Sequence, residues 1–391
     1  MKKDKDLVLS DKIEQRTELK LRNVDIYNIA SKARVSMTEK VLERIKNCGT
    51  FLEFATDENK EKSKLLNANF CENRFCPNCA ANQARKLAIE LAISLEWIKE
   101  KYGYRFIFLT LTAPNVPAHE VEDELRDYSK SFKRLFERKS VKAICKGYIR
   151  KLEMTYNIER DDFHPHYHVV IAVNNSYSTD KNYYLSQKKW LEMWRESKRD
   201  WSIEAVDVRA VNENNLEKSV QEFAKYIAKD SNYAYSLDVF STFYRTLKGK
   251  KYITFNGVFD EAHKKYEAGE LEYLKDVEEV EWVYKLRYSW KNEKYQLMEL
   301  LKLTESEKKK LNSSPEEAEN DRRNKKIARQ KNINKLLKIQ HKKLQAKLIS
   351  KKKTKDLRTG EMEFAKVEKN KIEKQIEFEK IVDKFNDKYK K

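Results

Sequence analysis

The chain has 391 residues and a formal net charge of +19, with 40% hydrophobic and 37% charged residues. This length allows two or three domains with a buried core. No hydrophobic run approaches the roughly 20 residues that cross a bilayer, and the charged N-terminus lacks the apolar stretch of a secretion signal. We therefore expect a cytoplasmic protein with reduced thiols and no membrane partner.

The first hundred residues divide into two predicted regions. Residues 1–45 are polar and are expected to form a helical N-terminal extension. Residues 46–100 contain four of the five cysteines and then a helix, in which Leu87 and Leu91 recur at helical spacing before Gly103 ends it. We expect this second region to be a small cysteine-rich subdomain.

Residues 101–275 alternate between predicted strands and helices. Aromatic and β-branched residues favour strands in four segments, which are 105–112, 146–157, 164–173 and 201–211. The polar tetrapeptide "ERDD", residues 159–162, indicates a hairpin between the second and third of them. We therefore predict an α+β fold in which a central antiparallel sheet is flanked by helices.

Three of the six histidines lie in "FHPHYHVVIAV", residues 163–173. Because alternate residues of a strand share one face, His164, His166 and His168 should project together. Neutral imidazoles on a rigid strand are suitable ligands for a divalent metal. We expect His166 and His168 to be metal ligands and His164 to be a further candidate. The alternative is that all three are buried core residues that bind no metal.

A carboxylate is expected as the third metal ligand. A hairpin that is symmetrical about residues 159–162 would place Glu153 opposite His168, where cross-strand Cβ atoms lie about 5 Å apart. A slip of one residue would turn Glu153 to the other face of the sheet. Asp161 and Asp162 in the turn are the alternative ligands.

The predicted helix 214–230 carries a tyrosine on its polar face. Tyr226 lies one turn after Glu222 and shares this face with Lys229, and Lys225 is adjacent. A phenol can attack a phosphate to form a phosphotyrosine, lysines can neutralise the developing charge, and a carboxylate can activate water. We assign these roles to Tyr226, to Lys225 and Lys229, and to Glu222. The alternative is a surface tyrosine beside an ordinary helix ion pair.

The cysteines indicate a second metal site. Cys76 and Cys79 form a C-x₂-C knuckle, and Cys48 and Cys71 can complete a four-thiolate structural zinc site. Buried thiols with a chance C-x₂-C spacing are the alternative. Two flanking arginines, Arg74 and Arg85, are candidate phosphate contacts.

The C-terminal region, residues 276–391, is expected to be a basic helical arm. Residues 321–360 contain sixteen Lys or Arg and only two Asp or Glu. Such a concentration of positive charge favours a nucleic-acid partner, with Lys325 and Lys326 as candidate DNA contacts. A solvated, highly charged helix is the alternative.

Three motifs, taken in order, resemble one known family. "FLTLTAPNV", "HPHYH" and "EFAKYIAKDSNY" are similar to the motifs of plasmid rolling-circle replication initiators of the HUH endonuclease superfamily. Within this family, the chain resembles the subgroup that has a single nucleophilic tyrosine and a glutamate four residues before it. The resemblance covers roughly residues 45–260 and does not extend to the basic arm.

This resemblance implies a fold and an activity. Residues 101–275 would form a HUH domain with a ferredoxin-like core, in which His166 and His168 bind Mg²⁺ or Mn²⁺. Tyr226 would nick one strand of the double-strand origin, at a nick site that is single-stranded. The nick would join the 5′ end to Tyr226 as a phosphotyrosine and leave a free 3′-OH. Glu222 would activate the water that ends a replication round.

The resemblance also implies a setting in the cell and leaves alternatives open. The protein would act in a bacterial cytoplasm with a host helicase and the replication machinery. The oligomeric state stays open, a homo-oligomer included. A single-tyrosine HUH transposase or mobilisation relaxase shares the same chemistry. A non-catalytic DNA-binding protein that contains zinc is the alternative from a different class.

Overall fold

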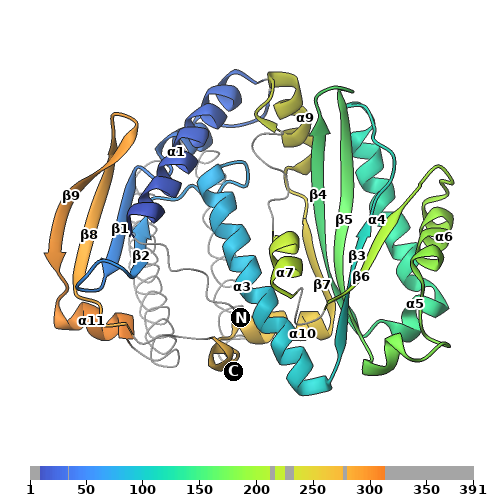
Figure 1. The fold of residues 1–391 in the computed structure, drawn as a ribbon. Helices are drawn as coiled ribbons and strands as arrows, with labels where there is room; N and C mark the ends of the chain where they lie inside the picture. Colours follow the sequence, from blue (N-terminus) through green and yellow to red (C-terminus); the bar gives the residue numbers. More distant parts are fainter. Residues whose placement is uncertain (1–8, 34, 212–215, 225–232, 276–279, 313–391) are drawn as a thin grey trace, which may run out of the picture. The chain divides into compact units, whose positions relative to one another are not determined.

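The chain folds into helices and two antiparallel sheets (Figure 1). The computed structural model describes residues 9–33, 35–211, 216–224, 233–275 and 280–312, which all belong to one compact unit. This arrangement confirms the predicted α+β class and the antiparallel pairing of the central sheet. Among the described residues, no helix is long and apolar enough to cross a membrane.

The larger sheet has five strands in the order β6-β3-β5-β4-β7. Their bounds are Arg105–Leu111 (β3), Gly147–Asn157 (β4), Asp162–Val173 (β5), Val206–Val211 (β6) and Ile253–Gly257 (β7). The four segments predicted to share a central sheet therefore do so. β7 adds a further strand beside β4.

Helices cover both faces of this sheet, as Figure 1 shows. One face packs against α4 (Val121–Glu137), α5 (Lys139–Ile144), α6 (Gln187–Lys198) and α9 (Leu237–Leu247). The other packs against α3 (Pro77–Tyr102), α7 (Leu216–Ala224) and α10 (Val258–Glu267). Short 3₁₀ turns span Asn175–Ser178 (η1) and Glu272–Leu274 (η2).

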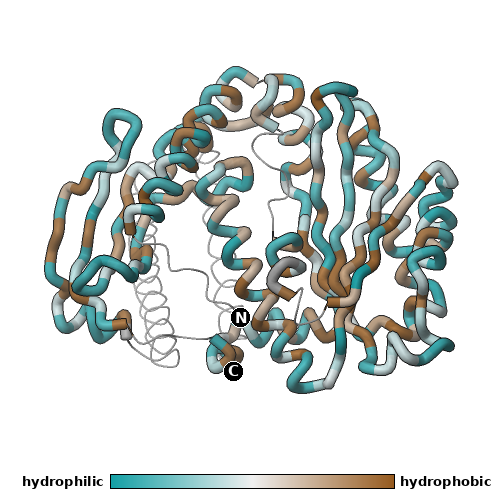
Figure 2. The backbone as a smooth tube through the Cα atoms, in the orientation of Figure 1, coloured by the Kyte–Doolittle hydropathy of each residue, from teal (hydrophilic) through white to brown (hydrophobic). Residues whose placement is uncertain are grey.

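The central strand β5 is buried on both faces, which explains its nearly continuous apolar sequence. Tyr167, Val169 and Ile171 belong to the core beneath α4. Val170 and Ala172 belong to the opposite core, together with Phe223 of α7. Figure 2 shows brown concentrated toward the lower ends of the sheet's strands, whereas teal and white are more frequent toward their upper ends. The histidines have the parity of Val170, so they lie on the face that α7 covers.

The smaller sheet was not predicted. Its strand order is β2-β1-β8-β9, with β1 at Phe51–Thr56, β2 at Ser63–Ala68, β8 at Tyr284–Lys291 and β9 at Lys294–Lys302. The expectation of a helical arm from residue 276 is therefore wrong for residues 284–302. Only α11 (Glu305–Asn312) is helical in the described part of that arm. Residues 313–391, including Lys325 and Lys326, lie outside the described residues.

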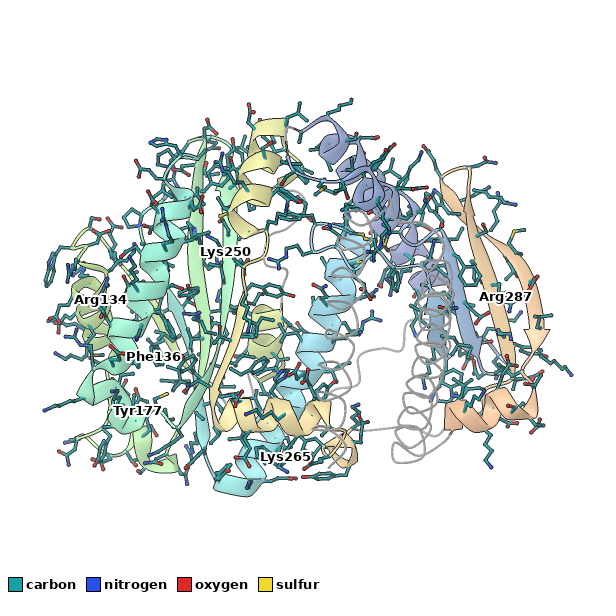
Figure 3. All side chains as sticks on the ribbon, turned by 180° about the vertical axis from the view of Figure 1, so that it is seen from behind. Arg134, Phe136, Tyr177, Lys250, Lys265 and Arg287 are labelled. Atoms are coloured by element: carbon teal, nitrogen blue, oxygen red, sulfur yellow. The ribbon has the colours of Figure 1, made fainter. Side chains whose placement is uncertain are left out.

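In the hairpin of β8 and β9, hydrophobic residues alternate with charged or polar ones along β8, a pattern typical of a strand. Asn292 and Glu293 adopt positive φ angles of 50° and 58° and form a two-residue turn. Arg287, labelled in Figure 3, lies between Glu53 and Glu299 of the neighbouring strands and is 2.6 Å from a carboxylate oxygen of each. This row of alternating charge connects β1, β8 and β9.

Two further helices, α1 (Leu9–Lys32) and α2 (Glu39–Asn47), precede β1 in the chain. Both helices lie largely within residues 1–45, where a helical extension was expected. The helix that follows the cysteines ends, as expected, at Gly103, which adopts a left-handed conformation with φ of 65°.

The predicted register of the β4–β5 hairpin is wrong by two residues. Glu153 pairs with His166, and Lys151 pairs with His168. The turn starts earlier than expected because the side chain of Asn157 accepts hydrogen bonds from the backbone N–H groups of Glu159 and Arg160. A shift of two residues keeps every side chain on its face of the sheet, so Glu153 still shares a face with both histidines.

Candidate functional site

Three side chains converge on one point of the larger sheet. Nε2 of His168 lies 3.1 Å from Oε2 of Glu153, and Nε2 of His166 lies 3.9 Å from the same oxygen. The candidate ligand atoms of the three residues all lie within 4.8 Å of one another. An ion with ligand bonds of about 2.1 Å needs its donors about 3–4 Å apart, so small side-chain movements suffice. We call these three residues the metal triad.

The opposite ring nitrogens of the two histidines are held by the sheet. Nδ1 of His166 lies 3.2 Å from the backbone oxygen of His164, and Nδ1 of His168 lies 3.3 Å from Oγ1 of Thr110. With an ion bound, hydrogen on Nδ1 would let each imidazole donate to these oxygens and direct the lone pair of Nε2 toward the ion. Such outer contacts orient the ligands of metal sites.

The charges in the metal triad also suit a cation. Burial, followed by the nearby His168, lowers the pKa of His166 to about 4, so its imidazole is neutral at physiological pH. Burial alone would raise the pKa of Glu153. The hydrogen bond from His168 and the charge of Lys151 outweigh burial and lower that pKa overall. The triad therefore offers two imidazoles, of which that of His166 is neutral, and one carboxylate.

The site lies where β3 ends. The pairing of β3 with β5 stops at Leu111 and Tyr167, whereas β4 continues beside β5 as far as Asp162. Pro165 falls in this extension, where β5 no longer pairs with β3. A proline has no backbone N–H for a ladder and is tolerated better there than in the middle of a sheet.

The other candidate ligands of this region lie outside the triad. His164 is half-buried, and its ring stacks on that of His166 with centroids 5.0 Å apart. Asp161 accepts a hydrogen bond from the hydroxyl of Tyr156. Asp162 accepts one from Asn115. Within the described residues, Glu153 is thus the carboxylate that joins the histidines.

The helix that leads to the predicted nucleophile covers the same face of the sheet. Tyr226, Lys225 and Lys229 lie outside the described residues, because the description of α7 ends at Ala224. Glu222 is described, and both of its carboxylate oxygens lie 3.0 Å from Nη2 of Arg209 in β6. At the next residue, the backbone oxygen of Phe223 accepts a hydrogen bond of 2.7 Å from Nζ of Lys151.

Four buried cysteine sulfurs form the second cluster, which we call the cysteine knuckle. Sγ of Cys48 lies 3.4 Å from that of Cys76 and 3.6 Å from that of Cys79, and Cys71 Sγ also lies 3.6 Å from that of Cys79. Backbone N–H groups of Cys71 and Glu72 donate to Cys48 and Cys79, respectively. All four thiols come together, as the spacing predicted.

The knuckle is joined to the larger sheet's core by Phe75. Its ring contacts those of Tyr233, Phe240 and Tyr244 at centroid distances of 5.5 to 5.8 Å. The hydroxyl of Tyr233 donates to the backbone oxygen of Phe75 at 3.1 Å. Tyr233 is the first described residue after the gap that contains Tyr226.

The two arginines near the knuckle have different surroundings. Arg74 donates to the backbone oxygens of Leu247 and Lys250, the latter labelled in Figure 3. Its guanidinium also lies over the ring of Tyr252. These contacts use Arg74 within the chain, whereas Arg85 is exposed on α3. A DNA contact by either residue stays a prediction.

Comparisons with known proteins agree with the motif resemblance. The family model described as Replication protein matches residues 62–296, which is more than half of the chain. The chain belongs to the Replication protein family. One relative, "Protein rep" of Staphylococcus aureus, is 47% identical over 221 residues, which are 56% of this chain and 95% of the relative. "Protein rep" of Streptococcus pneumoniae serotype 2 is 34% identical over 66% of this chain and 82% of its own length.

The family assignment confirms the resemblance to plasmid replication initiators. No solved structure matches the chain. The Replication protein match includes the whole metal triad, Glu222 and three cysteines of the knuckle, and it begins after Cys48.

Two residues of the site were missed in the sequence. Lys151 is 1% exposed and lies on the triad's face of the sheet. Its signal was a lysine two residues before Glu153, and therefore on the same face of the predicted strand. Arg209 was missed because its partner Glu222 lies on another element.

Proposed function

We propose that the protein initiates plasmid replication as a metal-dependent nicking and joining enzyme of the HUH type. The observation that carries the proposal is the convergence of His166, His168 and Glu153, on the face covered by α7, in a member of the Replication protein family. A five-stranded antiparallel sheet with helices on both faces is compatible with the ferredoxin-like core of such enzymes.

In the nicking step, the nucleophile is Tyr226. Its phenol oxygen attacks the scissile phosphorus, so that a new O–P bond forms while the bond to the 3′ oxygen breaks. The phenol gives up its proton as it attacks, the 3′ oxygen takes up a proton and leaves as a 3′-OH, and the 5′ phosphate stays on Tyr226. Mg²⁺ or Mn²⁺ in the metal triad would polarise the phosphate oxygens. Lys225 or Lys229 would neutralise charge on the phosphate.

Glu222 would end the reaction. Its carboxylate would take a proton from a water that attacks the phosphotyrosine and releases Tyr226. In the structure this carboxylate is bound by Arg209. The ion pair between the two must therefore open, or move as a unit, before Glu222 can accept a proton.

The cysteine knuckle would hold a structural Zn²⁺. Tetrahedral zinc with Zn–S bonds of about 2.3 Å places sulfurs about 3.8 Å apart, and the measured separations are 3.4 to 3.6 Å. Cys76 and Cys79 also lie at the N-terminus of α3, where the helix dipole favours thiolates. The donor set therefore fits the ion.

DNA is the proposed partner, at a double-strand origin and a single-stranded nick site. Arg85 and the basic segment 321–360, with Lys325 and Lys326, would contact phosphates. The same role implies a host helicase and replication proteins in the bacterial cytoplasm as further partners.

The test compares wild type with Tyr226→Phe on single-stranded oligonucleotides tiled across the replicon that carries the coding sequence, with Mn²⁺. Wild type should cleave one oligonucleotide and form a covalent adduct that survives denaturing electrophoresis, and the variant should do neither. Tyr273→Phe is the matched control, because Tyr273 is 67% exposed and outside the site.

Two outcomes would contradict the proposal. An adduct formed by Tyr226→Phe would remove Tyr226 as the nucleophile. A wild type that binds these oligonucleotides but cleaves none of them would favour a non-catalytic DNA-binding protein. The family match favours replication over transposition or mobilisation, which the same chemistry would also permit.

A further inference from the structure

Two cations of the larger sheet hold consecutive residues of α7. Lys151 in β4 binds the backbone oxygen of Phe223 at 2.7 Å, and Arg209 in β6 binds the carboxylate of Glu222 at 3.0 Å. β4 and β6 are separated by β3 and β5 in the sheet. The helix is therefore attached from two separate strands at one point along its length.

Lys151 is an unusual residue for this position. Its side chain is almost fully buried, although a lysine is seldom buried without a polar partner. The ammonium group lies 6.0 Å from the centroid of the Phe223 ring and bonds the carbonyl of the same residue. A charged donor to a helix carbonyl makes a strong, directed contact in such a dry environment.

Arg209 is itself oriented by its own strand and its neighbour. Nε lies 2.8 Å from Oδ2 of Asp207, and the guanidinium lies 5.1 Å from the centroid of the Phe108 ring. A planar guanidinium that is fixed by a carboxylate and an aromatic ring can hold a second carboxylate in one orientation. Glu222 therefore binds a guanidinium group whose orientation is already restrained by Asp207 and Phe108.

The same strand carries both a helix anchor and a metal ligand. Lys151 and Glu153 are two residues apart in β4 and share one face. Lys151 also pairs across the strands with His168. Movement of α7 relative to the metal triad would have to break the Lys151 bond or deform β4.

We propose that Lys151 and Arg209 are positioning residues that fix α7, and with it Tyr226, relative to the metal triad. We call the pair the α7 clamp. The inference rests on the proposed function, because Tyr226 follows two residues after the end of the described helix. In this role each residue acts through its contact with α7 and not by binding the reacting phosphate.

The first test does not depend on activity. Hydrogen exchange of α7 peptides is measured in full-length wild type, Lys151→Met, Arg209→Met and Lys198→Met. Lys198 is the matched control, because it is also a buried lysine and binds Glu124 and Asp127 on the far side of the sheet. Exchange in α7 should become faster in the two clamp variants and not in the control. Unchanged exchange in both clamp variants would overturn the inference.

The second test separates positioning from metal and DNA binding. Single-turnover cleavage with Mn²⁺ should slow about 10- to 100-fold in each clamp variant, as expected for a misplacement of about 1 Å. Oligonucleotide affinity should stay the same, and Mn²⁺ affinity should not weaken. Lys151→Arg should recover part of the rate, because it keeps the charge.

Other outcomes separate the two proposals. An equal loss of rate in Lys198→Met would show general destabilisation and would overturn the clamp. If Lys151→Met does not fold, the more exposed Arg209 still provides the test. If wild type itself does not cleave, the proposed function fails, and the exchange of α7 still decides whether the clamp holds the helix.

Discussion

Replacement of Phe75 by alanine tests whether the cysteine knuckle supports the larger sheet. Phe75 is 3% exposed, and its ring packs against three aromatic rings that belong to that sheet's core. Truncation of a buried phenylalanine costs about 3–5 kcal/mol, because both the burial and the packing are lost. For a unit that ends at Glu316, we expect a fall in Tm of about 5–8 °C.

The assay is thermal and urea unfolding followed by circular dichroism, with equal zinc content verified in each sample. Phe75→Leu keeps most of the apolar volume and should cost under about 2 kcal/mol. A loss of under about 1 kcal/mol for Phe75→Ala would refute the reasoning, because the knuckle would then fold without support from these rings.

Three further predictions follow from the site and the arm. Purified protein should contain one zinc per chain, and Cys79→Ser should lose it whereas Cys145→Ser should keep it, as measured by metal release to a chromogenic chelator. With EDTA present, stability should fall as the pH drops from 6.5 to about 4, by up to about 3 kcal/mol, because the unfolded chain protonates His166 more readily than the folded one. Urea unfolding at several pH values checks this, and His166→Gln with an unaltered pH dependence would contradict it. Truncation after Asn312 should weaken DNA binding and flatten its salt dependence, and an unchanged slope would assign the basic arm to another partner.

Alternation in the sequence was sufficient to predict the histidine face, because the period of a strand does not depend on its partners. It could not give the register of the hairpin. That depended on the side chain of Asn157, which caps the turn, and on Asp161, which accepts a positive φ of 52°. The prediction of Glu153 as a neighbour of the histidines survived because the error was an even number of residues.

Contacts between distant segments were beyond the sequence pattern. Residues 284–302 carry so much charge that their sequence resembles a solvated helix. In the structure, however, Arg287 forms an ion pair with Glu53, more than 200 residues earlier in the chain. In the same way, the burial of Lys151 depends on α7, which lies about 70 residues later in the chain. Local propensity contains no information about either partner.

The pairing of β1 with β8 has a consequence for synthesis of the protein. Phe54 pairs with Leu286, so the inner strand of the smaller sheet must wait for a partner made 232 residues later. At about 5–20 residues per second, this delay is roughly 10 to 45 s, during which one edge of β1 is open to pairing with another chain. Shortened versions that end before β8 would leave this edge open permanently. They are the versions in which we expect aggregation during expression, even if the metal triad is intact.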